Sequence, residues 1–154
     1  LGKVAFTTKE SSVKYMKSSY RISPIGKKGS QYPSCWEMPV KSWITRPTDE
    51  TGTVKAGKVQ IVGVAMGGTK KVRSVKVSVD GGSSWKKAKF IGPNLGKYAW
   101  RQFVLETTLS AGTYNIASLA SNGGNDKQPE LRMENRRGYA HNGWKDHSVN
   151  ITVV

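Results

Sequence analysis

The residues best suited to chemistry lie in one long polar segment between Ser121 and Trp144. Its basic and aromatic side chains are Lys127, Arg132, Arg136, Arg137, Tyr139, His141 and Trp144. Guanidinium groups bind oxyanions through paired hydrogen bonds and stay charged at any relevant pH. The pattern therefore predicts an anion site. A solvated basic loop around one buried Trp144 explains the same residues and stays open as an interpretation.

Other kinds of active site find little support. His141 and His147 could titrate near neutral pH, but no Ser, Cys or carboxylate stands at a spacing that resembles a nucleophilic site. Cys35 is the single cysteine, which excludes an internal disulfide and, with only two histidines, a closed zinc site. We expect Cys35 to be a small buried hydrophobic residue.

The charge balance indicates an anionic partner. Twenty-five Lys and Arg against ten Asp and Glu give a net charge of +15, and such a surface carries a strong positive field. Nucleic acid is the usual first expectation for this balance, but the basic residues are scattered and no nucleic-acid-binding motif accompanies them. No run of about 18 apolar residues occurs, so no membrane span is expected.

Short strands and turns must position these residues. The segment 74–85, SVKVSVDGGSSW, alternates valine with polar residues from Val75 to Val79, which is typical of a half-buried strand. Asp80, Gly81 and Gly82 then favour a hairpin turn, because they accept positive φ at low cost. The segment predicts two adjacent antiparallel strands, with the ring of Trp85 buried by the second.

Seven strands of this kind are predicted, at residues 40–45, 59–66, 72–79, 85–90, 100–106, 114–120 and 149–153. Their spacing favours an all-β fold, an immunoglobulin-like antiparallel β-sandwich, with a barrel as the second choice. The cysteine pair of antibody domains is absent. Packing around Trp85 and Trp100 would therefore have to hold the sheets together.

Residues 1–37 show no steady hydrophobic period and contain several Pro and Gly. They predict an extended N-terminal arm or interdomain segment with one helical turn at 11–17, followed by a sandwich domain at 38–154. Because the sequence starts at Leu1 rather than Met, we expect a fragment or a processed product.

Six segments in order resemble one known family. They are EMPVKS (37–42), ITRP (44–47), VSVDGGSSW (77–85), AWR (99–101), GNDKQP (124–129), and RGY (137–139) leading to NGW (142–144). In order and interval they are similar to the C-terminal molybdenum-cofactor oxidoreductase dimerisation domain of sulfite oxidases, across residues 12–154. Tyr20-Arg21 resembles the segment that leads out of the cofactor domain of that family.

The resemblance implies a sandwich that pairs two subunits into a homodimer, while a separate catalytic domain holds molybdenum and molybdopterin. This chain would then bind no cofactor and perform no reaction alone, and Cys35 would not be the metal ligand. In the family, the arginine directly before the glycine of the late loop reaches the oxyanion pocket beside molybdenum. By position this residue is Arg137, with Arg136 as the second candidate.

The implied parent enzyme oxidises sulfite to sulfate and passes electrons to a haem or cytochrome c-type acceptor. Sulfane dehydrogenases and plant-type nitrate reductases share the domain and stay open as parents. Two further classes stay open: a basic module that binds nucleic acid or another polyanion, and an adhesion or sugar-binding sandwich. The last would need an exposed aromatic platform, whereas we expect Trp85 and Trp100 inside. No membrane partner is expected, and the periplasm is favoured if the source is bacterial.

Overall fold

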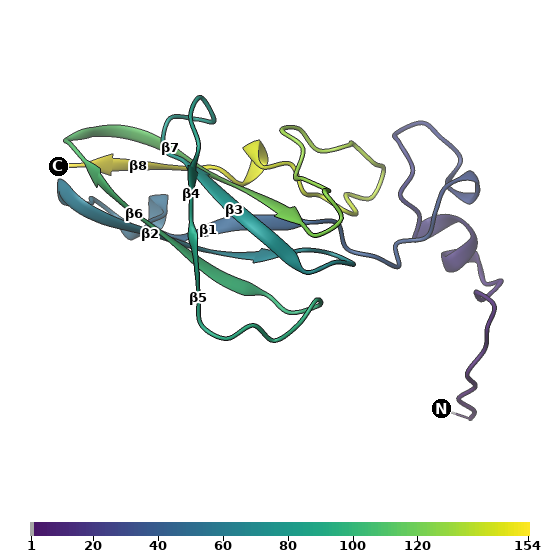
Figure 1. The fold of residues 1–154 in the computed structure, drawn as a ribbon. Coiled ribbons are helices and arrows are strands. Elements are labelled where there is room, and N and C mark those ends of the chain that lie inside the picture. Colours follow the sequence, from purple (N-terminus) through teal and green to yellow (C-terminus); the bar gives the residue numbers. More distant parts are fainter. Residues whose placement is uncertain (1) are drawn as a thin grey trace. The chain divides into compact units, whose positions relative to one another are not determined.

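A computed structural model describes residues 2–154 and shows two antiparallel four-stranded sheets (Figure 1). The first sheet has the order β1-β2-β6-β5, with β1 at Lys41–Arg46, β2 at Gly57–Met66, β6 at Arg101–Leu109 and β5 at Lys89–Ile91. The second has the order β4-β3-β7-β8, with β4 at Lys86–Lys87, β3 at Val72–Ser78, β7 at Gly112–Asn122 and β8 at Val149–Val153. The predicted all-β sandwich is confirmed, and the barrel is not formed.

Four short helical turns complete the described chain. They are the π-helical turn η1 (Tyr15–Ser19) and the 3₁₀ turns η2 (Gly29–Gln31), η3 (Asp49–Thr51) and η4 (Lys145–His147). The helical turn predicted at 11–17 thus forms further along the chain, at η1. No helix within residues 2–154 is long and apolar enough to cross a membrane.

The strand predicted at 85–90 is wrong as a single element. The chain changes sheets at Ala88, so that β4 pairs with β3 of the second sheet while β5 pairs with β6 of the first. The side chain of Ala88 is buried in the core, and its backbone N–H still donates to Val75 O at 2.9 Å. One edge segment therefore serves both sheets, which a period-two pattern cannot reveal.

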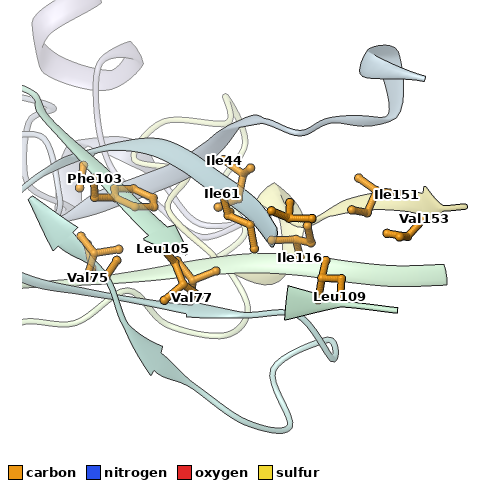
Figure 2. Packing of buried hydrophobic residues seen from close by; sticks show 14 of the residues in the cluster. Ile44, Ile61, Val75, Val77, Phe103, Leu105, Leu109, Ile116, Ile151 and Val153 are labelled. Carbon is orange, nitrogen blue, oxygen red and sulfur yellow. The ribbon is translucent and has the colours of Figure 1, made fainter. Parts of the chain in front are cut away.

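The core fills the space between the two sheets with aliphatic side chains around the buried phenyl ring of Phe103. Its fully buried members include Ile61 and Phe103 from the first sheet and Val75, Val77 and Ile116 from the second. Figure 2 shows these side chains gathered between the ribbons. Burial of such side chains stabilises a fold by roughly 1.5–3 kcal/mol each.

The expectation that Trp85 and Trp100 form the core is wrong. Trp85 is only half-buried and Trp100 is 39% exposed. Phe103 occupies the central position instead, and Gly63 leaves room for it, because a Cβ at Gly63 would collide with the phenyl ring. Trp100 precedes β6 and packs edge-on against Trp43, with ring centroids 4.8 Å apart.

The predicted hairpin between β3 and β4 is confirmed, with Lys76 opposite Lys87 and Val77 opposite Lys86. The carboxylate of Asp80 organises the turn. Asp80 Oδ1 accepts hydrogen bonds from Ser78 Oγ at 2.6 Å and Ser84 N at 2.8 Å, and Oδ2 accepts from Ser84 Oγ at 2.5 Å. These bonds, the one from Ser78 first, lower the pKa of Asp80 to about 2.

Packing requires glycine at position 82 of this turn, as does the positive φ angle there. Gly82 has a φ of 96°, and a Cβ there would collide with the ring of Trp144. The rings of Trp144 and Trp85 in turn pack edge to face, with their centroids 5.1 Å apart. The DGGSSW segment and the late NGW segment of the sequence therefore form one packed cluster.

Hydrogen bonds of the buried Gln128 side chain join the two sheets. Gln128 Oε1 accepts from Ser42 Oγ of β1 at 2.5 Å and from Ala120 N of β7 at 2.8 Å. Its Nε2 donates to Ser42 O at 3.3 Å and Asn142 O at 3.1 Å. The Gln128 side chain is 3% exposed, so these bonds are shielded from water.

Contacts divide the chain into two compact units. The sandwich unit comprises Glu37–Arg132 and Asn142–Val154 and contains every strand. The arm unit comprises the residues up to Trp36 together with Met133–His141. The division of the chain into domains at 1–37 and 38–154 stays a prediction.

Arg21 holds the arm unit together. Its guanidinium donates to Met16 O at 2.7 Å and Tyr32 O at 3.2 Å and forms an ion pair with Glu10 at 2.8 Å. A hydrogen bond from Ser34, together with Arg21, lowers the pKa of Glu10. The guanidinium of Arg21 is thus engaged within its own unit.

Cys35 is half-buried rather than buried, which corrects the expectation for this residue. Its backbone N–H donates to Tyr20 O at 3.0 Å. Burial raises the pKa of the Cys35 thiol, so the reactive thiolate is disfavoured at neutral pH.

Candidate oxyanion-binding site

The two candidate arginines occupy the centre of one tight turn in the arm unit. Gly138 N donates to Asn135 O at 3.2 Å, which closes the turn around Arg136 and Arg137. Gly138 has a φ of 71°, a left-handed conformation that glycine adopts without strain. The sequence NRRG therefore folds locally as a turn that presents two guanidinium groups.

Asn135 fixes the shape of this turn. The Asn135 side chain is 7% exposed, and its Oδ1 accepts from the backbone N–H groups of Arg137 and Tyr139, each at 3.0 Å. Its Nδ2 donates to Tyr139 O. An asparagine that bonds the backbone two and four residues ahead holds the chain in one conformation. The Arg137 backbone is thereby anchored while its side chain stays outside the turn.

Both arginine side chains are exposed. Within residues 2–154, neither guanidinium forms a hydrogen bond or an ion pair with another side chain. Each therefore keeps its five N–H donors for an external acceptor, and a planar guanidinium can offer two parallel bonds to one oxyanion.

Tyrosines pack beside the turn within the arm unit. The ring of Tyr139 lies 6.0 Å from that of Tyr20, and Tyr20 lies 6.1 Å from Tyr15. Pro24 and Asn135 form an isolated backbone bridge. The Tyr20-Arg21 segment and the Arg137-Gly138-Tyr139 segment thus belong to one compact unit, although they are far apart in the sequence.

The seven predicted residues divide between the two units. Arg136, Arg137, Tyr139 and His141 belong to the arm unit, and Lys127, Arg132 and Trp144 to the sandwich unit. Arg132 forms an ion pair with Asp146 at 2.7 Å, and Trp144 is buried. Burial of Trp144 agrees with the alternative interpretation, a solvated basic loop around one buried tryptophan. The roles of Arg137 and Arg136 in anion binding stay predictions.

The base of the late loop is closed within the sandwich unit. Trp144 N donates to Pro129 O at 2.9 Å, and Lys145 N donates to Glu130 O at 3.2 Å. A Cβ at Gly143 would lie 2.6 Å from Arg132 N, so only glycine allows the two ends of the loop to approach this closely. Sequence reasoning missed this closure and the role of Asn135, although an asparagine before RRG is itself a turn signal.

The described residues do not fit a metal centre. No three His, Cys, Asp or Glu residues within 2–154 gather as potential ligands. The expectation that molybdenum is held elsewhere than in this chain stays a prediction.

Exposure of Trp100 removes one argument made from the sequence. The sequence argues against a sugar-binding or adhesion role only if Trp85 and Trp100 lie inside, and Trp100 is exposed beside Trp43. The class of the protein must therefore rest on other observations.

Comparisons with known proteins identify the family of this chain. Residues 32–154 match the family described as the Mo-co oxidoreductase dimerisation domain. Mitochondrial sulfite oxidase of Homo sapiens is 39% identical over 129 residues, covering 79% of this chain and 23% of that protein. Sulfite oxidase of Gallus gallus is 33% identical over 119 residues, covering 73% of this chain and 26% of that protein.

A solved structure has a similar fold. The sulfane dehydrogenase SoxCD from Paracoccus pantotrophus superposes with a TM-score of 0.59 at 26% identity, covering 76% of this chain and 33% of that chain. This chain spans about a quarter of the length of the curated relatives it matches. With the sandwich, the motif order and these matches in agreement, the chain belongs to the Mo-co oxidoreductase dimerisation domain family of the sulfite oxidases.

Proposed function

We propose that this chain is the dimerisation domain of a sulfite-oxidising molybdenum enzyme, in which Arg137 binds the oxyanion substrate and Arg136 is the second candidate. The match of residues 32–154 to the dimerisation family, with relatives named sulfite oxidase, is the observation that carries the proposal.

The arginine assignment draws its support from the Asn135 turn. Arg136 and Arg137 are consecutive, and neither side chain is engaged within the described chain. The backbone N–H of Arg137 is bonded to the buried Asn135 side chain, which makes the position of its Cα better defined than that of a free loop residue. A preorganised guanidinium loses less conformational freedom when it binds an anion.

The reaction of the parent enzyme is a two-electron oxidation. Sulfite and water give sulfate, two protons and two electrons. A molybdenum cofactor in a separate catalytic domain supplies the redox chemistry when bound. The guanidinium of this chain binds and orients the sulfur oxyanion by charge-assisted hydrogen bonds. The electrons pass to a haem or a cytochrome c-type acceptor.

Pairing of two subunits is the second part of the proposal. A homodimer with two-fold symmetry uses the same surface on both copies, so one sandwich domain suffices to pair the subunits. The family description as a dimerisation domain supports this role.

A sulfane dehydrogenase or a nitrate reductase relative is the alternative parent. The sequence identity is 26% with the sulfane dehydrogenase structure and 39% with human sulfite oxidase. The higher identity favours sulfite as the substrate.

The complete protein, purified with its cofactor, tests the proposal. We expect sulfite-dependent reduction of cytochrome c and a dimeric mass by sedimentation, with stoichiometric molybdenum by mass spectrometry. Nitrate reduction or sulfane oxidation without sulfite turnover would assign another parent, and a monomer at all concentrations would contradict the pairing role.

A further inference from the structure

A second basic feature lies in the sandwich unit and shares no residue with the Arg136–Arg137 turn. A hollow of about 360 Å³ is lined by four basic residues, Arg73, Lys76, Lys87 and Lys127, and by the hydroxyls of Ser74 and Ser121. Its lining, as described, contains no carboxylate. We call it the basic hollow.

The register of the second sheet places the basic residues on one face. Val75 and Val77 of β3 are buried, so Lys76 between them points away from the core. Lys76 lies directly opposite Lys87 of β4. Like charges opposite each other across two strands are destabilising, and an anion between them removes that repulsion.

Lys127 and Arg73 are the other two basic residues that line the basic hollow. Ser121 of β7 is the register partner of Ser74, and Lys127 forms an isolated bridge with Ser121. The register of β3 and β7 shifts between Val72 and Ser74, which leaves Arg73 at a bulge. Bulges redirect a side chain relative to its neighbours, and Arg73 accordingly lines the same hollow as Lys76.

Hydrogen-bond donors remain available at this surface. Ser74 Oγ and Ser121 Oγ lie 2.7 Å apart, so their mutual bond uses one hydroxyl proton and leaves the other. Arg73 Nη1 donates to Asn125 Oδ1 at 3.2 Å, which fixes the guanidinium and leaves its other donors. The carboxylate of Asp126 in the adjacent turn accepts from Asn122 Nδ2 at 2.8 Å and offsets only one of the four positive charges.

The size of the basic hollow indicates the class of anion. Its volume is about 360 Å³, and its four basic residues are spread around it. One tetrahedral oxyanion would leave most of this space and most of the four charges unused. We propose that the basic hollow binds an anion with two or three linked phosphate groups, free or carried by a nucleotide.

Titration calorimetry of the full-length protein with tripolyphosphate, ATP and sulfate tests the proposal. We expect one tripolyphosphate per chain at about 50 mM salt, weaker binding at about 200 mM, and sulfate at least about tenfold weaker than tripolyphosphate. Equal affinity for ATP and tripolyphosphate would identify the phosphate chain alone as the ligand. Tighter binding of ATP would identify a nucleotide. Sulfate binding as tightly as tripolyphosphate would overturn the proposal.

A charge-matched pair of variants separates a site from the general +15 field. Lys76→Gln with Lys87→Gln should weaken tripolyphosphate binding at least about tenfold, because both charges face the anion. Lys58→Gln with Lys89→Gln removes the same charge from exposed positions on the first sheet. This control should change the affinity for tripolyphosphate less than about twofold. Equal losses in the two double variants, or no binding by the parent protein at the lower salt, would overturn the proposal.

Thermal unfolding gives a second measurement that does not depend on calorimetry. Tripolyphosphate should raise the Tm of the parent protein and of the first-sheet control but not that of the Lys76/Lys87 variant, because only a ligand of the folded state stabilises it. Circular dichroism of the variants verifies that the sandwich is retained. An equal rise in all three proteins would contradict a local site.

Discussion

Replacing Gln128 with Leu should destabilise the sandwich strongly, because it removes the polar link between the sheets while keeping a similar volume. The variant deprives the buried Ala120 N of its 2.8 Å partner and the partly buried Asn142 O of its 3.1 Å partner. Ser42 Oγ keeps its hydrogen bond with Ser118 Oγ at 3.0 Å, so the substitution costs this hydroxyl less free energy.

The magnitude follows from the groups left without partners. Each buried donor or acceptor that loses its partner costs about 1–3 kcal/mol, and the partly buried Asn142 O costs less than this upper bound. Gln128→Leu should therefore lower the free energy of unfolding by about 2–5 kcal/mol. That is a large share of the roughly 5–15 kcal/mol that holds a domain folded. At about 2–4 °C per kcal/mol for a chain of this length, Tm should fall by roughly 4–20 °C.

Gln60→Leu is the matched control for this substitution. Gln60 is exposed on β2 and makes one side-chain bond, to Glu106 Oε1 at 2.9 Å. The free energy of unfolding of Gln60→Leu should stay within about 0.5 kcal/mol of that of the parent protein. Urea unfolding followed by tryptophan fluorescence measures both variants. Equal midpoints for Gln128→Leu and Gln60→Leu would refute the role of the buried link.

Two further predictions concern the β3–β4 hairpin. Gly82→Ala should lower the free energy of unfolding by about 1–3 kcal/mol, because the new Cβ collides with the Trp144 ring and the residue has a positive φ. Gly123→Ala is the control and should be near neutral, since the nearest atom to its Cβ is 3.8 Å away. Similar urea midpoints for the two variants would contradict this prediction. The folded-state pKa of Asp80 is about 2 against an ordinary 3.8, so its stabilising effect is present above 3.8 and is lost as pH falls through 2. Thermal unfolding should therefore show a shallower acid decline in Asp80→Asn than in the parent, and parallel pH curves would contradict it.

The hairpin and all the strands except the one predicted at 85–90 could be predicted, because their signals are local. Valine alternation and the DGG turn depend only on neighbouring residues, and both agree with β3, β4 and their pairing. The core could not be predicted from residue size alone. Trp100 lies just before β6, outside the alternating face, so a smaller ring at Phe103 fills the centre instead.

The candidate site could be predicted in composition but not in arrangement. The paired arginines and the glycine after them are visible in the sequence, whereas the buried Asn135 that shapes their turn depends on tertiary packing. The basic hollow depends on strand register and on the bulge at Arg73, which join residues more than 40 positions apart in the sequence. Long-range pairing of this kind leaves no trace in local periodicity.

Steady-state kinetics of the full-length protein with sulfite test the central claim most directly, through Arg137→Gln and the neighbouring Arg136→Gln. Loss of one charge-assisted contact, about 1.5–3 kcal/mol, should raise KM in Arg137→Gln roughly 10- to 150-fold with a smaller fall in kcat, while Arg136→Gln changes KM less than about threefold. An Arg137→Gln enzyme with the KM and kcat of the parent would contradict the account, as would a larger KM effect from Arg136→Gln.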